Sequence, residues 1–314
     1  MTTHSPFRSG FVSIVGRPNA GKSTLLNAMV GDKLAIVSER PQTTRTSVQG
    51  VITLPDAQIV FIDTPGVHQA PALINRRMLD TVRAALQDRD AVLLMADALA
   101  PFNEEDQQAL DMIRKLTAPV FLVLNKIDGV DHKQELLPRL EHYKSLYDFA
   151  EYYPVSALTG EGLPQLRDAL VARLPEGPPY YPSDYLTDQP ERFLAAELIR
   201  EKILIETRQE VPHSVAVVVE TWEDTKRLIR IAATIYVERA GQKGIVIGAK
   251  GAMLKSVGTL ARQEIEKLTG KKIFLELFVK VRPDWRESAQ FLDAIDWRSM
   301  HGVKVDESEP EKTS

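Results

Sequence analysis

The chain has 314 residues, of which 44% are apolar and 26% charged, and its formal net charge is −4. This composition predicts a folded protein with room for two domains, not a disordered chain. The absence of cysteine excludes disulfides, thiolate metal sites and a cysteine nucleophile, and it suits a reducing cytoplasm. No apolar run approaches the ~20 residues of a membrane span, and Met1 to Gly10 lacks the pattern of a signal peptide.

The first motif follows the apolar run from Phe11 to Val15, which predicts a strand, and precedes helix-forming residues from Leu25. Between them the sequence reads G-x4-G-K-S, and glycines there let backbone N–H groups surround a phosphate chain. Lys22 adds a positive charge for the β- and γ-phosphates, and the Ser23 hydroxyl is placed to ligate Mg²⁺. We expect this loop to bind the phosphates of a nucleotide through Gly16, Arg17, Pro18, Asn19, Ala20, Gly21, Lys22, Ser23 and Thr24.

Apolar runs and helical periodicity alternate from this strand to about Leu174, which predicts an α/β domain with a mainly parallel sheet. Ligands of such domains bind at the carboxyl ends of the strands. The further predicted strands are Val48–Ile52, Ile59–Ile62, Ala91–Ala96, Val120–Leu124 and Tyr152–Val155.

A second motif, Asp63-Thr64-Pro65-Gly66, follows the predicted strand Ile59–Ile62. There the Asp63 carboxylate can hold Mg²⁺ through water, and the Gly66 N–H can meet a γ-phosphate. The same four-residue pattern also describes ordinary turns, but its place directly after a buried strand favours the nucleotide site.

The third motif, Asn125-Lys126-Ile127-Asp128, carries the base specificity. Asp128 can accept the N1–H and N2–H of guanine, whereas adenine has neither donor, so we expect GTP and not ATP as the ligand. The Lys126 stem is expected along the base plane, and Asn125 is expected to tie the loops together. The segment Ser156-Ala157-Leu158 follows the last strand and could offer N–H groups to guanine O6, although alone it is an ordinary loop.

The polar stretch from Arg40 to Thr46 has no periodicity and lies between the phosphate loop and the second strand. We interpret it as a switch in which Thr44 reaches the metal and γ-phosphate when GTP is bound and is released after hydrolysis. Thr43 and Thr46 are the other candidates, and a plain solvated loop is the alternative.

A proline-rich stretch, from Pro175 to Pro182, predicts the domain boundary. Beyond it the elements follow the order α-β-β-α-α-β, with strands at His213–Glu220, Leu228–Val237 and Ile273–Val281. The expected division of the chain is a first domain at 1–177, a linker at 178–191, a second domain at 192–283 and an acidic, frayed tail at 284–314.

Gly248-Ala249-Lys250-Gly251 lies between two predicted helices and resembles the G-x-x-G loop of a type II KH domain, an α+β fold. Two glycines allow close approach of the backbone to single-stranded RNA, and Lys250 adds charge. Residues 185–282 carry 17 Lys+Arg against 13 Asp+Glu, an excess of +4 (17 − 13). Lys255 and Arg262 lie on one face of the following helix, which is either a phosphate track or a solvated surface.

Several aromatic residues of the second domain could either bind RNA bases or pack in the fold. Phe274 and Phe278 point to one side of the last strand among charged residues, where they could stack on bases or pack beneath a neighbouring segment. Trp222 and Tyr236 have the same ambiguity. His213, beside a proline and without a ligand cluster, is expected to be structural.

In this order and spacing the motifs resemble those of the translation-factor-like GTPases, and Gln-Thr-Thr-Arg together with the second domain narrows the resemblance to the Era group. Membership implies a P-loop GTPase domain followed by a type II KH domain. It also implies binding near the 3′ end of small-subunit ribosomal RNA, a role in 30S subunit assembly, a monomer, and a cytoplasmic location with peripheral association to the inner face of the cell membrane.

The expected catalytic residues are Lys22, Thr44, Gly66 and Asn19. Val67 stands where Ras-like GTPases have a glutamine, and an apolar side chain cannot orient the attacking water, so intrinsic hydrolysis should be slow. The resemblance implies a potassium ion at Asn19, although this residue could instead brace the loop or contact the β-phosphate. A metabolic enzyme that transfers phosphate from GTP, and an RNA-binding adaptor with a structural nucleotide, are the rival interpretations.

Overall fold

The computed structural model describes residues 6–38, 40, 42–67, 71–207, 211 and 214–298. The chain divides into two compact units, with the main boundary between Asp188 and Gln189. None of the helices in this described part has the length and apolar character that a membrane crossing requires.

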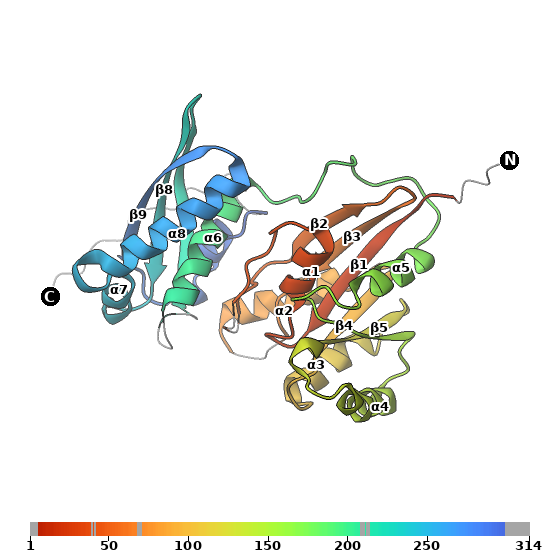
Figure 1. Cartoon of the computed structure of the whole chain (residues 1–314). Coiled ribbons are helices and arrows are strands. Elements are labelled where there is room, and N and C mark those ends of the chain that lie inside the picture. Colours follow the sequence, from red (N-terminus) through yellow and green to blue (C-terminus); the bar gives the residue numbers. More distant parts are fainter. Residues whose placement is uncertain are drawn as a thin grey trace. The chain divides into compact units, whose positions relative to one another are not determined.

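The first unit alternates strands with helices (Figure 1). Its strands are β1 (Arg8–Gly16), β2 (Val48–Thr53), β3 (Ala57–Asp63), β4 (Ala91–Asp97), β5 (Val120–Asn125) and β6 (Glu151–Pro154). Its helices are α1 (Lys22–Val30), α2 (Leu73–Ala85), α3 (Glu104–Ile113), α4 (Leu136–Leu146) and α5 (Leu163–Arg173).

These strands form one sheet in the order β2-β3-β1-β4-β5-β6. All neighbouring pairs are parallel except β2 and β3, which run antiparallel. Helices cover both faces, and for this reason an inner strand such as β5 is buried at every position and is apolar up to its last residue, Asn125. The predicted α/β class with a mainly parallel sheet is confirmed.

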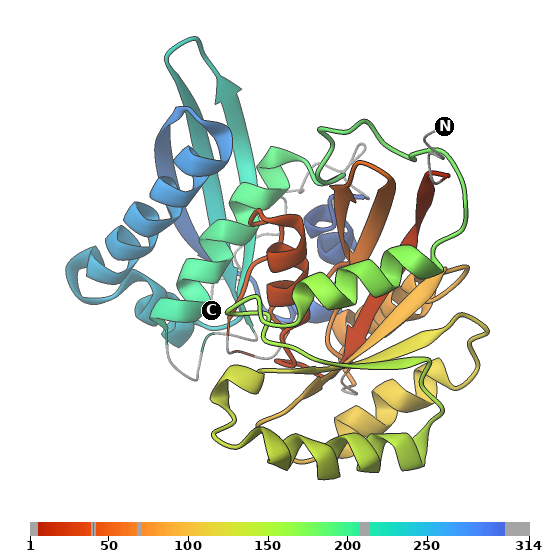
Figure 2. The ribbon, with the colours of Figure 1, turned by 45° about the vertical axis from the view of Figure 1, so that its right-hand side comes forward.

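An apolar layer lies on each face of the sheet. Leu25 of α1 and Leu166 of α5 belong to the layer on one face, where Figure 2 shows both helices. Val82 of α2 and Leu110 of α3 belong to the other layer. Because β1, β3, β4 and β5 run in the same direction, their carboxyl ends meet at one edge of the sheet.

The proline-rich segment after α5 packs against the first unit. The Gln58 side chain, fully buried, accepts hydrogen bonds from the N–H groups of Tyr180 (2.7 Å) and Tyr181 (2.9 Å) and donates one to the Tyr181 carbonyl (2.9 Å). The N–H of Val51 in β2 donates to the Leu186 carbonyl at 2.8 Å. The segment expected to be a linker, residues 178–191, therefore belongs to the first unit as far as Asp188, because one buried amide and a strand edge satisfy its backbone.

The second unit has the element order predicted for a type II KH fold. Its elements are α6 (Glu191–Glu206), β7 (Ala216–Asp224), β8 (Leu228–Val237), α7 (Ala240–Ile247), α8 (Ala252–Thr269), β9 (Lys272–Val281) and α9 (Ala289–Ile295). The sheet order is β7-β8-β9, with β7 antiparallel and β9 parallel to the central strand. Figure 2 shows α6 and α8 side by side on one face of this sheet.

The first strand of this sheet differs from its expected range of 213–220. It begins at Ala216 and continues to Asp224, through a bulge between Val219 and Thr221 that shifts the register against β8. The sequence did not indicate this continuation because the end of the strand is charged. Asp224 at that end forms an ion pair with Lys271 at 2.6 Å. His213 lies outside the described residues.

The first part of the expected acidic tail, residues 284–314, is folded as far as the structure describes it. Trp285 is fully buried and donates from Nε1 to the Ser214 carbonyl at 3.1 Å, and Phe291 of α9 lies against Tyr236 at a ring separation of 5.0 Å. A few apolar residues therefore anchor this segment in spite of its acidic composition. Residues 299–314 lie outside the described part.

Candidate functional site

The glycine-rich loop joins the carboxyl end of β1 to the amino end of α1. Asn19 and Gly21 have φ angles of 61° and 95°, so the backbone turns sharply before α1 begins at Lys22. A Cβ atom on Gly21 would lie 2.1 Å from Nδ2 of Asn125, and only glycine fits there. The geometry matches the predicted phosphate loop.

Lys22 is buried beneath this loop. Its ammonium donates to the carbonyls of Gly16 (3.1 Å) and Arg17 (2.8 Å). Burial lowers the pKa of Lys22 to about 8, against the opposing effect of the Asp63 carboxylate. The ammonium remains mostly protonated at pH 7 and can exchange a loop carbonyl for a phosphate oxygen.

Three oxygen-bearing side chains meet beside the loop. The Ser23 hydroxyl donates to Oδ2 of Asp63 at 2.6 Å and lies 2.8 Å from the Thr44 hydroxyl. Asp63 is fully buried, burial raises its pKa to about 6, and its Oδ1 has no hydrogen-bond partner. Within the described part of the chain, no three His, Cys, Asp or Glu residues form a metal cluster, so a hard cation here would rely on hydroxyl and carboxylate oxygens together.

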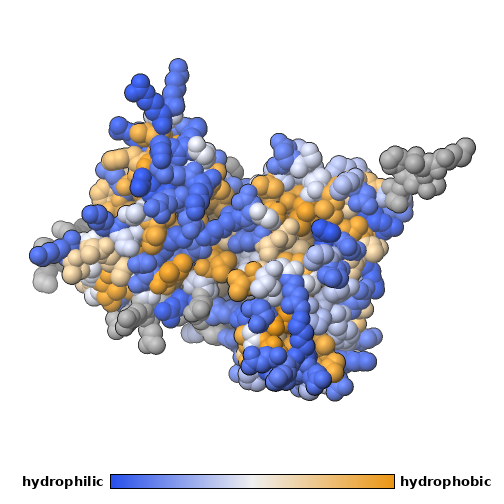
Figure 3. Space-filling model, in the orientation of Figure 1, coloured by the Kyte–Doolittle hydropathy of each residue, from blue (hydrophilic) through white to orange (hydrophobic). Residues whose placement is uncertain are grey.

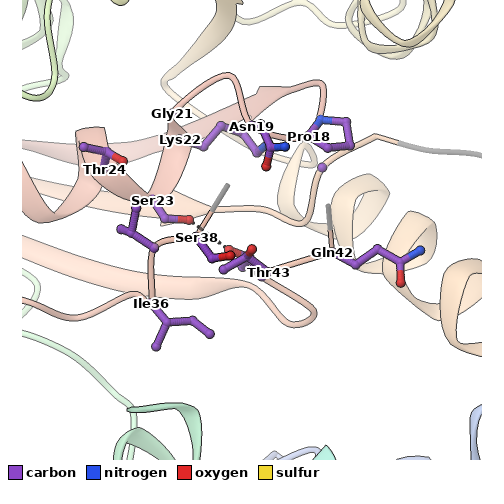
Figure 4. A pocket seen from close by; sticks show the side chains of 13 residues that line it. Pro18, Asn19, Gly21, Lys22, Ser23, Thr24, Ile36, Ser38, Gln42 and Thr43 are labelled. Atoms are coloured by element: carbon purple, nitrogen blue, oxygen red, sulfur yellow. Dashed lines mark hydrogen bonds between the residues drawn. The ribbon is translucent and has the colours of Figure 1, made fainter. Parts of the chain in front are cut away.

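The polar segment before β2 reaches this cluster through one of its three threonines. Thr44 meets Ser23, whereas the Thr43 hydroxyl donates to the Arg40 carbonyl at 2.6 Å. The two loops line a cavity of about 50 Å³ (Figure 4). Its lining residues are Pro18, Asn19, Gly21, Lys22, Ser23, Thr24, Ile36, Val37, Ser38, Gln42, Thr43, Thr44 and Gly66.

The residues after Asp63 divide between the cavity and the core. Gly66 lies so close to the phosphate loop that a Cβ atom would meet the Cα of Pro18 at 2.7 Å. Thr64 is fully buried and donates to the Ile14 carbonyl at 2.8 Å, and Val67 is 1% exposed in the apolar layer. Thus Gly66 faces the site, whereas the side chains of Thr64 and Val67 are part of the fold.

The base-recognition segment follows β5. Asn125 donates from Nδ2 to the Ala20 carbonyl and accepts from the Ala157 N–H, both at 2.9 Å, so it ties the loops together as expected. Oδ1 of Asp128 accepts from the buried Ser156 hydroxyl at 2.6 Å, which orients the exposed carboxylate. Leu158 is 78% exposed, Pro65 is buried, and Ile127 is buried in the core.

Sequence reasoning grouped Arg17 with the phosphate-binding residues, but its side chain turns away from the cavity. The guanidinium lies 3.0 Å from Asp106 and 3.5 Å from Asp97, two aspartates that the motifs did not include. Asp97 also accepts from Nζ of Lys126 at 2.7 Å. The position of Asp97 at the carboxyl end of a central strand was the signal that could have identified it.

In the second unit the predicted RNA-binding loop lies between α7 and α8. Gly248, Lys250 and Gly251 have φ angles of 73°, 51° and 79°, and a Cβ atom on Gly248 would lie 2.6 Å from that of Met253. Ala249 and Lys250 are exposed at the start of α8. The loop therefore presents the Lys250 side chain to solvent, while the N–H groups of Gly248 and Gly251 donate to the carbonyls of Gly244 and Gly248.

One face of α8 is apolar and buried, with Val257, Ala261 and Ile265 at its centre. The opposite face is hydrophilic, as Figure 3 shows over this helix. Lys255 on this face is exposed, and Arg262 lies 3.4 Å from Glu266 one turn along. Arg262 is therefore already paired within the helix, whereas Lys255 extends from its first turns.

The aromatic residues of the second unit have different environments. Phe274 and Phe278 are 51% and 52% exposed on β9, and the Arg230 guanidinium lies over the Phe274 ring at 5.9 Å. Tyr236 is 6% exposed and packs on α9, so it is a core residue, while Trp222 is half-buried. Within the described part of the chain, no segment buries the β9 pair.

Comparison with known proteins agrees with both halves of this geometry. A family described as "50S ribosome-binding GTPase" matches residues 11–126. A second family, described as "KH domain", matches residues 210–286. The first match covers the phosphate loop and the Asp63 segment and ends before Asp128, and the second covers the G-x-x-G loop.

Full-length relatives share this arrangement. The chain is 51% identical to the GTPase Era of Geobacter metallireducens over 93% of this chain and 99% of the relative, and 50% identical to that of Syntrophus aciditrophicus over 91% and 94%. It superposes with a TM-score of 0.89 on a variant of Aquifex aeolicus Era bound to GDP and aluminium fluoride. Its TM-score against a complex of Era with MgGDPNP and nucleotides 1506–1542 of 16S ribosomal RNA is 0.90. Both structures are 38% identical to this chain and cover 92% of it and 99% of their own chains. The chain therefore belongs to the Era family of GTPases.

Proposed function

We propose that this GTPase is a molecular switch that binds small-subunit ribosomal RNA near its 3′ end and assists assembly of the 30S subunit. One observation carries the proposal: the Thr44 hydroxyl lies 2.8 Å from that of Ser23. The polar segment before β2 can therefore sense what occupies the phosphate loop. The solved complex of Era with the end of 16S ribosomal RNA supports the choice of RNA.

Mg²⁺ fits the cluster of Ser23, Thr44 and Asp63. Oδ1 of Asp63 is buried without a hydrogen-bond partner, and a cation is the partner that its charge and burial favour. The bound ion would neutralise charge on the β- and γ-phosphates. Ser23 and Thr44 supply neutral oxygens, and Asp63 acts directly or through water.

The remaining catalytic work falls to the chain's own groups. The Lys22 ammonium is positioned to bind phosphate oxygens, and the Gly66 N–H to donate to the γ-phosphate. Val67 is buried in the core and cannot orient water, so intrinsic hydrolysis is slow. Asn19 lines the cavity in a left-handed conformation, where it either holds a potassium ion or braces the loop.

Guanine recognition rests on Asp128 and Lys126. The Ser156 hydroxyl orients the Asp128 carboxylate, which accepts N1–H and N2–H of the base. A purine without these donors leaves the carboxylate unpaired, and such sites discriminate by about 10⁴ to 10⁵. The N–H groups of the loop from Ser156 to Leu158 are the candidates for guanine O6.

The RNA contact is proposed for the loop Gly248-Ala249-Lys250-Gly251. The glycines allow close approach of an RNA backbone, and the start of α8 directs N–H groups toward phosphates. Lys250 and Lys255 supply positive charge, and Arg262 adds to it farther along α8. The family resemblance extends the proposal to a cytoplasmic monomer that associates peripherally with the inner face of the cell membrane.

The experiment measures binding of a labelled RNA with the sequence of the 16S 3′ end to the full chain, loaded with GDP or a non-hydrolysable GTP analogue. We expect the two nucleotides to change RNA affinity about tenfold, which corresponds to a coupling of about 1.4 kcal/mol. Thr44→Ala should abolish that difference. Thr46→Ala is the matched control, because this threonine does not line the cavity. Equal RNA affinity of the parent protein in both states would overturn the switch.

A further inference from the structure

A buried group of charges lies behind the nucleotide site, at the carboxyl end of β4. Asp97, whose side chain is 9% exposed, accepts from Nζ of Lys126 at 2.7 Å and lies 3.5 Å from the Arg17 guanidinium. Its other oxygen accepts from the Leu99 N–H at 2.8 Å. One carboxylate therefore contacts both the phosphate loop and the base-recognition segment.

The partners on the phosphate-loop side are held firmly. Arg17 lies 3.0 Å from Asp106 and donates to the Pro101 carbonyl at 3.2 Å. Asp106 accepts from the Asn103 N–H at the start of α3, and it is 4% exposed. Because Asp106 already balances the Arg17 charge at the shorter distance, Asp97 is left as the close partner of Lys126.

Lys126 does not need this contact to be solvated. Its side chain is 35% exposed, so its ammonium could reach water, yet it points inward to Asp97. Its backbone is left-handed, with φ of 68°, between Asn125 and the residues that lead to Asp128. Since buried ion pairs contribute little net stability, an orienting role accounts for this contact better than a stabilising one.

We propose that Asp97 is a positioning residue for guanine recognition. By holding the Lys126 ammonium at one end, it keeps the lysine stem along the face of the purine. Through Arg17 the same carboxylate fixes the start of the phosphate loop relative to the base. This inference rests on the proposed nucleotide site and adds a residue outside its sequence motifs.

The first test is Asp97→Asn, which keeps the size of the side chain and an acceptor for the Leu99 N–H. We expect GDP and GTP to dissociate about tenfold faster, the loss typical of one charge-assisted hydrogen bond. Both nucleotides should be affected equally. Asp97 contacts Lys126 of the base-recognition segment and Arg17 of the phosphate loop, and neither residue belongs to the cluster proposed for the γ-phosphate. Fluorescent nucleotide analogues and stopped flow measure the rates.

The second test separates positioning from a structural role. Asp97→Asn is combined with Lys126→Met, and dissociation rates of the two single variants and the double variant are compared. If Asp97 acts through Lys126, its substitution changes the rate little once the ammonium is absent. Asp111→Asn is the matched control, because it removes an exposed ion pair of α3 with Arg114.

The stability of each variant without nucleotide is measured by urea unfolding, alongside the nucleotide dissociation rates. An Asp97→Asn protein that loses stability but dissociates nucleotide at the parent rate would overturn the inference, as would effects of the two substitutions that simply add. If Asp97→Asn does not fold, Lys126→Gln breaks the same 2.7 Å contact from the exposed side, and an unchanged dissociation rate then overturns it. Failure of the parent chain to bind guanine nucleotides would instead remove the proposed function itself.

Discussion

At the residue scale, the site depends on a few side chains whose partners are fixed before any ligand arrives. The buried Ser156 hydroxyl orients the Asp128 carboxylate, and Asn125 bridges the Ala20 carbonyl and the Ala157 N–H. Such preorganised hydrogen bonds lower the cost of ordering on binding. Base selectivity is therefore a property of named atoms that substitution can test.

Asp128→Asn should turn the preference from guanine toward xanthine nucleotides. An amide in place of the carboxylate can donate to the xanthine oxygen at carbon two, but it loses one of its two acceptor positions for guanine. We expect GDP affinity to fall about a hundredfold or more and XDP affinity to rise. Titration calorimetry with both nucleotides measures the change.

The control for this prediction is Asp131→Asn, an exposed aspartate of the same loop. It should leave both affinities unchanged. If Asp128→Asn bound GDP as the parent does, or if ATP bound the parent as tightly as GTP, the assignment of the base site would be wrong.

The sequence predicted which loops form the site better than it predicted which side chains enter it. Glycines, strand ends and motif spacing located the loops, because backbone geometry constrains those residues locally. Thr44 was the first choice from the sequence, but Thr43 and Thr46 stayed open. The contact of Thr44 with Ser23, and the inward turn of Arg17 toward Asp106, depend on partners about 20 and 90 positions away in the chain. Periodicity carries no information about such contacts.

At the element scale, alternation and helical spacing were enough to predict that each sheet strand exists and the order α-β-β-α-α-β, but not the bounds of β7. They failed where a small number of apolar residues outweigh the local composition. Trp285 and Phe291 bury a segment that is acidic overall, and the Gln58 amide holds a proline-rich segment that reads as a linker. Tertiary contacts decide such segments, and single-sequence patterns do not register them.

The junction of α8 and β9 allows a test at this scale. Glu266, in the last turns of α8, accepts from the Ile273 N–H at 3.2 Å and lies 3.6 Å from Nζ of Lys272. The Ile273 hydrogen bond is the main cause that lowers the pKa of Glu266 below its ordinary 4.5. The charged carboxylate therefore fastens the end of the helix to the start of the edge strand.

Glu266→Gln should reduce the urea midpoint of the second unit at pH 7. The pKa of Glu266 is lower in the folded state than in the unfolded state. The carboxylate therefore stabilises the fold at pH values above its unfolded-state pKa, and this stabilisation is lost as the pH falls through its folded-state pKa. The difference between parent and variant should therefore shrink below pH 4.5. Glu276→Gln, an exposed glutamate on β9, is the control. A difference that stayed constant down to pH 3 would contradict the electrostatic explanation.

At the scale of the whole molecule, the two units carry different chemistry. The nucleotide cluster and the base site lie in the first unit, and the G-x-x-G loop lies in the second. A switch requires that the state of one unit change the behaviour of the other, and this coupling is a free energy that can be measured.

The tryptophans provide a probe that belongs to the second unit alone. The chain has three, at positions 222, 285 and 297, and all of them follow the boundary at Asp188. Trp285 is fully buried and hydrogen-bonded, while Trp297 packs near Phe193. Their emission therefore reports on the KH unit, in which all three lie.

Replacing GDP by a GTP analogue should change this tryptophan emission if nucleotide state is transmitted between the units. The Thr44→Ala protein should bind both nucleotides but give the same emission with each, because its switch segment no longer meets the metal and γ-phosphate. Thr46→Ala should behave like the parent chain. Identical parent spectra with both nucleotides, at saturation confirmed by calorimetry, would mean that the KH unit does not sense the phosphate site. An RNA-binding adaptor with a structural nucleotide would then describe the molecule better than a switch.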